Sequence, residues 1–330
     1  MTIPPLSELS HPIHSDGADA ISMKGLSYSY NFPIEDRYCI ERWLMPNGPW
    51  MCLGVFDGEN CHGGFAAADF VSTTLPGIIK RALIAQMNHS LAPSDVAKIL
   101  VDSIRSVDET ITEECLSVLS SADAPDQMST LKDPNFLCSK HNNQWDSENL
   151  AKKHHTSNKS EVLRILEEHP EEPHVINPSL AIPRIFGGIN LTRALGDVVL
   201  KVDPKCFEVV KSIMPSVAEG AHWKYSKTPP YLSNIAETSY APPPATTLNR
   251  YLILGSDGFI GLFPKGTSPS SFAVVASAAR HGENLALKLL WEAFGGDSEA
   301  GQANYESSYR RERRPANGRI DDTTIIVFPL

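Results

Sequence analysis

Residues 54–64, GVFDGENCHGG, run from an apolar segment into an Asp-Gly pair and then into a polar loop that ends in two glycines. The apolar side chains that end at Phe56 predict a buried strand, and Asp57 stands where that strand stops. Gly58 and the later glycine pair allow a tight turn. A carboxylate beside an exposed glycine carbonyl suits a hard cation, although a polar turn between a strand and a helix would use the same residues.

Further acidic residues stand at other predicted strand ends. They are Glu35 and Asp36 before the first strand, Asp257 after a strand predicted at 251–255, and Asp321 and Asp322 before a strand predicted at 323–328. Acids at strand ends converge when the strands share a sheet, and they then raise one another's pKa unless cations lie between them. An oxygen-only cluster favours Mg²⁺ or Mn²⁺ over zinc. The alternative is that these acids are separate turn residues.

Composition narrows the function classes. The chain has 330 residues, of which 42% are hydrophobic, and a formal net charge of −10. We therefore expect no nucleic-acid partner, and no apolar run approaches the length of a membrane span. The dense basic run at 309–314 is either a solvated loop or a contact site for an acidic or phosphorylated partner.

The cysteines predict neither a disulfide framework nor a zinc site. There are six, and none forms a CxxC pair. The chain is large and its first residues resemble no secretory signal, which makes a disulfide framework unexpected. Cys61 is interpreted as an ordinary loop residue.

The order of patterns predicts an α+β domain with no internal repeat. Residues 1–22 are interpreted as a flexible tail, 23–330 as the folded domain, and 121–146 as a linker-like region within it. A hairpin is predicted over 35–56, with its turn at Pro46-Asn47-Gly48-Pro49. Helical patterns cover the segments 65–71, 78–87 after Pro76, a long stretch from Ser94, 160–168 and 284–294. The stretch 296–318 is interpreted as a polar loop.

Four blocks in this order resemble the signature of the metal-dependent serine/threonine protein phosphatases, the PPM or type 2C family. They are GVFDG, INLTRALGD, YLILGSDGF and RIDDTTIIVF. The segments NFPIEDRY, SKTPPYLSNIAE and ENLALKLLWEAFGGD resemble the pyruvate dehydrogenase phosphatase branch in particular. The resemblance implies a four-layer αββα sandwich, in which two antiparallel sheets are flanked by helices, and a phosphorylated protein as substrate.

The resemblance also implies roles for the acids. Asp57 would bridge two Mg²⁺ or Mn²⁺ ions and the Gly58 carbonyl would bind one of them. Glu35, with Asp36 beside it, would anchor the first ion, and Asp257 and Asp321 would hold the other. A bridging water would then attack phosphoserine or phosphothreonine. Asp197 and Asp322 would support the metal waters, although Asp197 can equally cap a turn, and Arg193 is interpreted as a structural partner for a nearby acid.

The loop after Asp57 departs from the family pattern. The family has His directly after Asp-Gly, where it is the usual candidate for protonating the leaving alcohol, whereas here Glu59 follows and His62 comes three residues late. Either His62 reaches the same place, or Glu59 is the acid, or the step is impaired. Loss of a general acid typically costs a factor of about 10² to 10⁴.

A second departure is that a central hairpin of the family and its extra metal-site Asp are missing between Leu119 and His141. Two rival functions follow: a catalytically impaired pseudophosphatase that binds a partner, or a scaffold stabilised by calcium or magnesium. The visible N-terminus predicts a cytoplasmic or nuclear protein, while the subfamily resemblance implies the mitochondrial matrix if the true N-terminus is missing.

Overall fold

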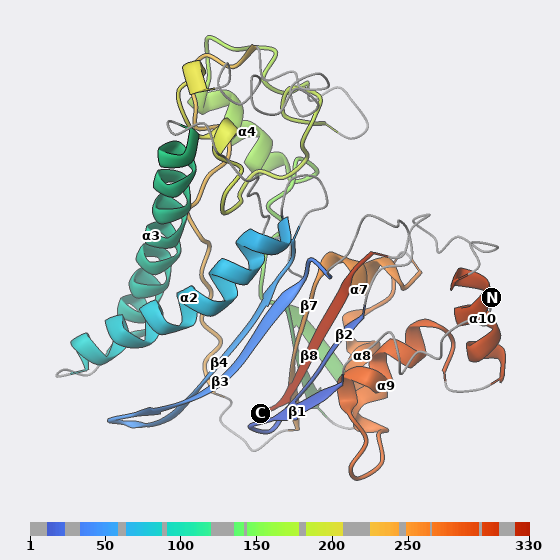
Figure 1. Cartoon of the computed structure of the whole chain (residues 1–330). Helices are drawn as coiled ribbons and strands as arrows, with labels where there is room; N and C mark the ends of the chain where they lie inside the picture. Colours follow the sequence, from blue (N-terminus) through green and yellow to red (C-terminus); the bar gives the residue numbers. More distant parts are fainter. Residues whose placement is uncertain are drawn as a thin grey trace. The chain divides into compact units, whose positions relative to one another are not determined.

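The computed structural model describes residues 12–23, 34–58, 64–87, 91–119, 135–141, 144–177, 183–206, 225–243, 249–264, 266–296, 299–309 and 321–330. The chain divides into two compact units (Figure 1). The first contains residues 1–57, 132–151 and 239–330, and the second contains residues 58–131 and 152–238. The first unit is thus assembled from three separate stretches of the chain.

An antiparallel sheet forms the centre of the first unit. Its strands are β1 (Ile13–Ser15), β2 (Ala18–Met23), β8 (Thr323–Pro329), β7 (Arg250–Gly255), β5 (Asn135–His141) and β6 (Gln144–Asn149), in that spatial order. The strand β8, at the end of the described chain, lies between β2 and β7. The complete sheet therefore forms only when segments from both ends of the described chain pair with each other.

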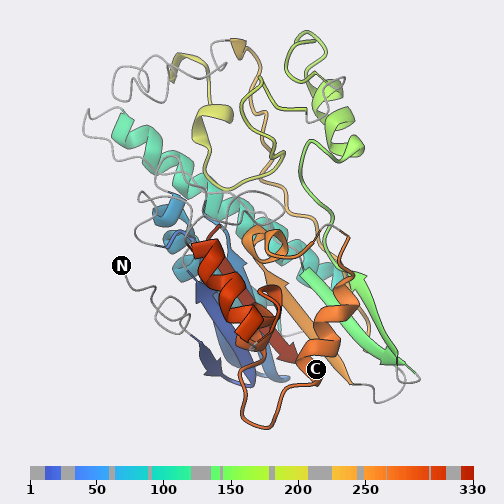
Figure 2. The ribbon, with the colours of Figure 1, turned by 90° about the vertical axis from the view of Figure 1, so that its right-hand side faces the viewer.

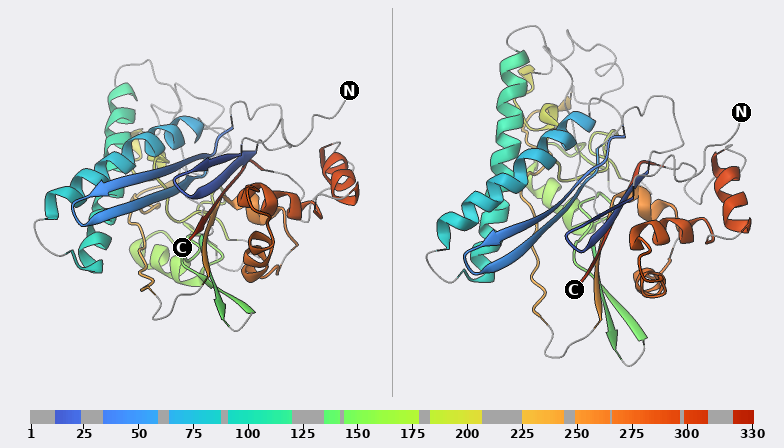
Figure 3. Two further views of the ribbon diagram at one scale, coloured as in Figure 1. Left: turned by 90° about the horizontal axis from the view of Figure 1, so that it is seen from below. Right: turned by 60° about the horizontal axis from the view of Figure 1, so that its bottom comes forward.

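A second, two-stranded sheet lies on one face of the first. It is the hairpin of β3 (Arg37–Met45) and β4 (Gly48–Phe56), as predicted (Figure 3). Val55 of β4 packs against Ala20, Leu254 and Ile326, which come from β2, β7 and β8. The alternating side chains of these strands give one face to the hairpin and the other to helices, as the two-residue period of a strand requires.

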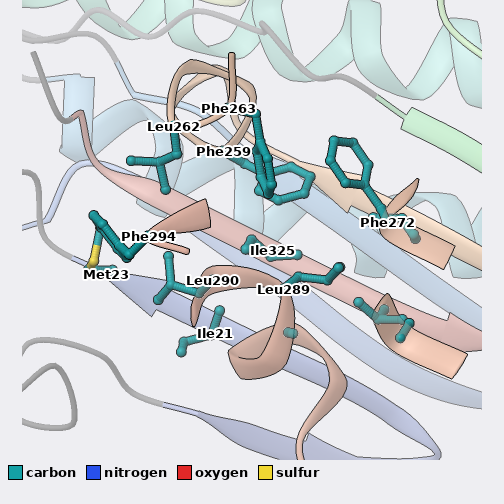
Figure 4. Packing of buried hydrophobic residues seen from close by; sticks show 14 of the residues in the cluster. Ile21, Met23, Phe259, Leu262, Phe263, Phe272, Leu289, Leu290, Phe294 and Ile325 are labelled. Atoms are coloured by element: carbon teal, nitrogen blue, oxygen red, sulfur yellow. The ribbon is translucent and has the colours of Figure 1, made fainter. Parts of the chain in front are cut away.

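Helices cover the opposite face of the large sheet. They are α7 (Asp257–Gly261), α8 (Pro269–Ser277), α9 (Leu285–Ala293) and α10 (Glu299–Tyr309). Figure 4 shows Leu289 and Leu290 of α9 over Ile21 and Ile325 of the sheet, with Phe259 close by. This apolar cluster fixes the strand ends that carry Asp257 and Asp322.

The second unit consists of helices and long irregular segments. Its helices are α2 (Gly64–Gln86), α3 (Pro93–Leu119), α4 (Lys159–Glu168) and the short 3₁₀ helix η1 (Val198–Leu200). A separate core is built around Ile165, Ile176, Ile185 and Tyr231. Among the described helices of both units, none is long and apolar enough to cross a membrane.

The fold class predicted from the sequence, two antiparallel sheets with helices, is confirmed. The flexible tail predicted over 1–22 is wrong for the part that is described, because β1 and β2 occupy 13–23 and every residue of β2 is buried. The local signal was present: Asp16-Gly17 forms the two-residue turn between the strands with positive φ at both residues. Asp-Gly is favoured in such hairpin turns because Gly adopts positive φ without strain.

Two stretches predicted to be irregular contain regular structure. Residues 135–149, which overlap the linker-like region, form the β5–β6 hairpin, and β5 pairs with β7 (Figure 2). The stretch 296–318 contains α10. Polar strands such as Gln144–Asn149 lack the apolar alternation of a half-buried strand, so pairing with a neighbour decides their structure. The missing central hairpin would fall largely in residues outside the described ranges, and it stays a prediction.

Candidate metal centre

The acidic residues stand at strand ends that the two sheets bring together in the first unit. Asp36 precedes β3 and Asp57 follows β4, and the register pairs Arg37 with Phe56. On the large sheet, Asp257 follows β7 and Asp322 precedes β8, where Gly255 pairs with Ile325. Antiparallel pairing therefore places the two acids of each strand pair at the same end of that pair.

Hydrogen bonds join the two sets of acids. The Glu35 backbone N–H donates to Asp322 Oδ2 at 2.7 Å, and the Asp257 N–H donates to Asp57 Oδ2 at 3.2 Å. Each bond links the β3–β4 hairpin to the large sheet. The acids predicted from distant parts of the sequence thus lie at one edge of the first unit.

The β7–β8 junction is held by contacts that the sequence analysis did not identify. Ser256 is fully buried, its backbone N–H donates to Thr324 O at 3.0 Å, and its Oγ accepts the Thr324 N–H at 3.0 Å. Gly258 passes so close that a Cβ there would lie 2.1 Å from the Asp322 carbonyl oxygen. The glycine of the Ser-Asp-Gly sequence is therefore required by close packing against the Asp-Asp segment.

Burial raises the pKa of two of these carboxyl groups. Burial, and then the charges of Asp322 and Asp321, raise the pKa of Glu35 to about 7. The pKa of Asp36 is also raised to about 7, chiefly by burial; the nearby hydroxyls of Ser256 and Thr324 oppose the shift. Crowded acids behave in this way when no cation compensates them.

The donor set fits a hard divalent cation. Glu35 Oε2 and both carboxyl oxygens of Asp36 are buried and make no hydrogen bond of ordinary geometry, so they are available as ligands. All candidate donors are oxygens, which suits Mg²⁺ or Mn²⁺. Within the described residues, however, no three His, Cys, Asp or Glu side chains are already grouped tightly enough to hold an ion. The acids converge pairwise, and their positions as metal ligands stay predictions.

The remaining predicted residues are placed as follows. Gly58 is buried and follows Asp57 directly. Asp321 is exposed, and its carboxylate accepts a hydrogen bond from the Asp322 N–H at 2.9 Å. Glu59 and His62 lie outside the described residues. Their predicted catalytic roles are therefore untested.

Arg193 and Asp197 belong to the second unit. Arg193 donates to Glu161 Oε1 at 2.7 Å and to the Ile235 carbonyl at 2.8 Å, which confirms its interpretation as a structural partner for an acid. Asp197 is buried, adopts a left-handed backbone conformation with φ 48° and precedes η1. Its support of metal waters stays a prediction.

A buried ion pair anchors the segment around Asp197. Asp108 of α3 accepts hydrogen bonds from Lys201 Nζ and the Gly196 N–H, each at 2.7 Å, while Asn234 donates to its other oxygen at 2.9 Å. The sequence held a signal for this site, since Asp108 follows Ile104 by four residues and thus interrupts the apolar stripe of the helix.

Comparison with known proteins shows a similarity to protein phosphatases over part of the chain. The Protein phosphatase 2C family model matches residues 135–279. Protein phosphatase 2C 35 of Oryza sativa subsp. japonica is 28% identical over 186 residues, which cover 55% of this chain and 26% of that protein. The mitochondrial [Pyruvate dehydrogenase [acetyl-transferring]]-phosphatase 1 of Saccharomyces cerevisiae is 32% identical over 124 residues, covering 36% of this chain and 20% of its own length. The matches thus span about a quarter or less of these relatives.

The fold agrees with this match. The serine-threonine phosphatase 2C of Toxoplasma gondii superposes with a TM-score of 0.56 at 16% identity, covering 99% of this chain and 100% of that one. Family match, relatives and fold, together with acids at the expected strand ends, lead to one conclusion. Over residues 135–279 the chain is similar to the Protein phosphatase 2C, or PPM, family, its fold is that of a solved phosphatase 2C, and it resembles a pyruvate dehydrogenase phosphatase.

Proposed function

We propose that this chain is a metal-dependent protein serine/threonine phosphatase that hydrolyses phosphoserine or phosphothreonine. One observation carries the proposal: Glu35, Asp36, Asp57 and Asp257, from three strand ends, lie at one edge of the first unit, and the first two have buried oxygens available as ligands. The similarity to protein phosphatases 2C over residues 135–279 supports the reaction class.

Two hydrogen bonds fix the positions of acids in the candidate metal site. The backbone N–H of Asp257 fixes the Asp57 carboxylate, and Asp322 fixes the backbone of Glu35. Asp57, the Gly58 carbonyl, Glu35 with Asp36, Asp257 and Asp321 would hold two Mg²⁺ or Mn²⁺ ions. Bound there, the ions would lower the pKa of a shared water and neutralise charge on the phosphoryl oxygens.

The leaving seryl or threonyl oxygen needs a proton, because an alkoxide is a poor leaving group. We place this general acid in the loop after Gly58, at His62 or Glu59. The substrate is a phosphorylated protein, and the yeast relative makes a phosphorylated pyruvate dehydrogenase a natural first substrate to try. By the same resemblance, the mitochondrial matrix is the alternative to a cytoplasmic or nuclear location.

The test is hydrolysis of a phosphothreonine peptide by the purified chain, with Mn²⁺ and after treatment with EDTA. We expect metal-dependent release of phosphate that is lost in Asp57→Asn. Glu148→Gln, which changes an exposed acid on β6, serves as the matched control and should keep full activity.

A folded protein without turnover above the Asp57→Asn variant would overturn the phosphatase proposal. Calorimetry with Mn²⁺ then separates the rivals. Binding of a phosphorylated protein without hydrolysis would identify a pseudophosphatase, whereas metal binding with no phosphoprotein binding would identify a metal-stabilised scaffold.

A further inference from the structure

Two cysteine thiols face each other across the β3–β4 hairpin. The register pairs Cys39 with Gly54 and Glu41 with Cys52, so the cysteines are diagonal neighbours on one face of the hairpin. Their Sγ atoms are 4.0 Å apart. Because Tyr38, Ile40, Leu53 and Val55 face the large sheet, the alternation of the strands turns the two thiols to the opposite face.

Gly54 gives the thiol pair its space. A Cβ at Gly54 would lie 3.1 Å from Cys39 Sγ, so a larger residue opposite Cys39 would displace the sulfur. The absent side chain lets the Cys39 thiol lean along the strand pair towards Cys52. Cys39 is only 8% exposed and Cys52 is half-buried, so a small oxidant meets Cys52 first.

The two sulfurs differ in reactivity. The hydrogen bond between the two sulfurs lowers the pKa of the Cys52 thiol, against the opposing effects of burial and Glu41. The same hydrogen bond, with burial, raises the pKa of Cys39 well above its ordinary value. Cys52 is the more exposed of the two thiols, so it is the attacking group and Cys39 the resolving one.

We propose that Cys39 and Cys52 are a modification site at which hydrogen peroxide forms an intramolecular disulfide. The Cys52 thiolate attacks one peroxide oxygen, the O–O bond breaks, and the released hydroxide takes up a proton to become water. Cys39 then attacks the sulfur of the Cys52 sulfenic acid; the S–S bond forms, the S–O bond breaks, and the Cys39 proton leaves with the hydroxide as a second water. The two sulfurs lose the two electrons that the peroxide gains.

Bond formation requires the two sulfurs to move closer together. A disulfide bond is about 2.05 Å long, so the sulfurs at 4.0 Å must approach further, and diagonal strand positions are more widely spaced than directly opposed ones. The inference concerns the chemistry of the hairpin and does not rest on phosphatase activity.

The test is peptide mapping of the native full chain after hydrogen peroxide treatment, without reductant. Intact mass should fall by about 2 Da, the two hydrogens lost, and dithiothreitol should restore it. Cleavage after glutamate separates Cys39, Cys52 and Cys61 into different peptides, because Glu41 and Glu59 lie between them. We expect the linked peptides to be those that carry Cys39 and Cys52.

Variants sharpen the result. Cys39→Ser should stop the loss of 2 Da and leave Cys52 as a sulfenic acid that a dimedone probe traps. Cys206→Ser, which removes a free cysteine of the second unit, should be oxidised like the wild-type chain. A link between Cys52 and Cys61, or peroxide-treated chain in which both Cys39 and Cys52 remain thiols, would overturn the proposal. The peptide mapping uses the wild-type chain, so the proposal can still be tested if a variant fails to fold.

Discussion

Glu161 in α4 shows how a single residue keeps its charge inside the protein. Its carboxylate accepts hydrogen bonds from Arg193 Nη2 at 2.7 Å and from Arg164 Nη2 at 3.1 Å, and the residue is only 4% exposed. Burial alone would raise its pKa, but the hydrogen bonds from Arg193 and Arg164, together with the nearby Thr192 hydroxyl, outweigh it and hold the pKa at about 2. The folded state therefore favours the ionised form.

This depressed pKa predicts a pH-dependent contribution to stability. The contribution is fully present above the ordinary glutamate pKa of 4.5 and is lost as the pH falls towards about 2. We expect Glu161→Gln to lower the free energy of unfolding by up to about 3 kcal/mol at pH 7, and the gap between the two proteins to narrow below about pH 4.5. Urea titrations of both proteins from pH 7 down to pH 3 measure the gap.

Glu168→Gln is the control for this effect, since Glu168 also pairs with Arg164 but its side chain is 47% exposed. That substitution should change the stability by less than about 1 kcal/mol. A gap between wild type and Glu161→Gln that stays constant down to pH 3 would show that the charge of Glu161 is not what stabilises the fold.

At the scale of elements, a buried ion pair attaches α3 to the segment around η1. The Asp108–Lys201 ion pair is almost fully buried, with side chains 2% and 7% exposed. Lys201 Nζ also donates to the Ala194 carbonyl at 2.7 Å. The lysine therefore connects Asp108 of α3 to both ends of the segment 194–201. Removal of one partner leaves the other charge buried without compensation.

We expect Asp108→Ala to lower the free energy of unfolding by about 3–5 kcal/mol, because Lys201 is then buried without its counter-charge. Adding Lys201→Met should recover part of that loss, and a double-mutant cycle from urea unfolding measures the coupling. Glu109→Gln, at the next and exposed position of α3, is the control and should be close to neutral. Additive losses from Asp108→Ala and Lys201→Met would contradict the pairing.

At the scale of the whole molecule, the first unit depends on segments far apart in sequence. The strand β8, near the end of the chain, pairs with β2 near its beginning, and Ile21 and Met23 of β2 are fully buried in the cluster under α9. Asp19 Oδ2 also accepts the N–H of Leu285 at the start of α9, at 2.7 Å. The first strands are therefore part of the core, not an appendage.

Removal of residues 1–23 should abolish the cooperative unfolding of the first unit, because it exposes the edge of β8 and opens the helix-covered core.

Point substitutions in β1 and β2 test the same placement in the full-length chain. Ile21→Ala should cost about 2–5 kcal/mol, while Ile13→Ala, at a residue 39% exposed, should cost less than about 1 kcal/mol. Circular dichroism during urea unfolding measures both, and equal effects of the two substitutions would contradict the placement of β2.

The sequence by itself determined the features that depend on short-range patterns. The β3–β4 hairpin follows from its turn and alternation, α3 and α9 from helical periodicity, and the resemblance to type 2C phosphatases from the order of the Asp-bearing blocks. Even the convergence of Asp57 and Asp257 was predictable, because both follow strands and strand ends share edges. These signals lie within a few residues of one another.

Only the tertiary structure decided features that need a distant partner. The polar strand β6 exists because β5 pairs with it and with β7, and β2 is buried because β8 lies beside it. Gly258 is required by the Asp322 carbonyl, and the Cys39–Cys52 approach depends on the register that puts Gly54 opposite Cys39. The physical reason is that pairing and close packing are properties of two segments together, so the sequence of either segment alone does not contain them.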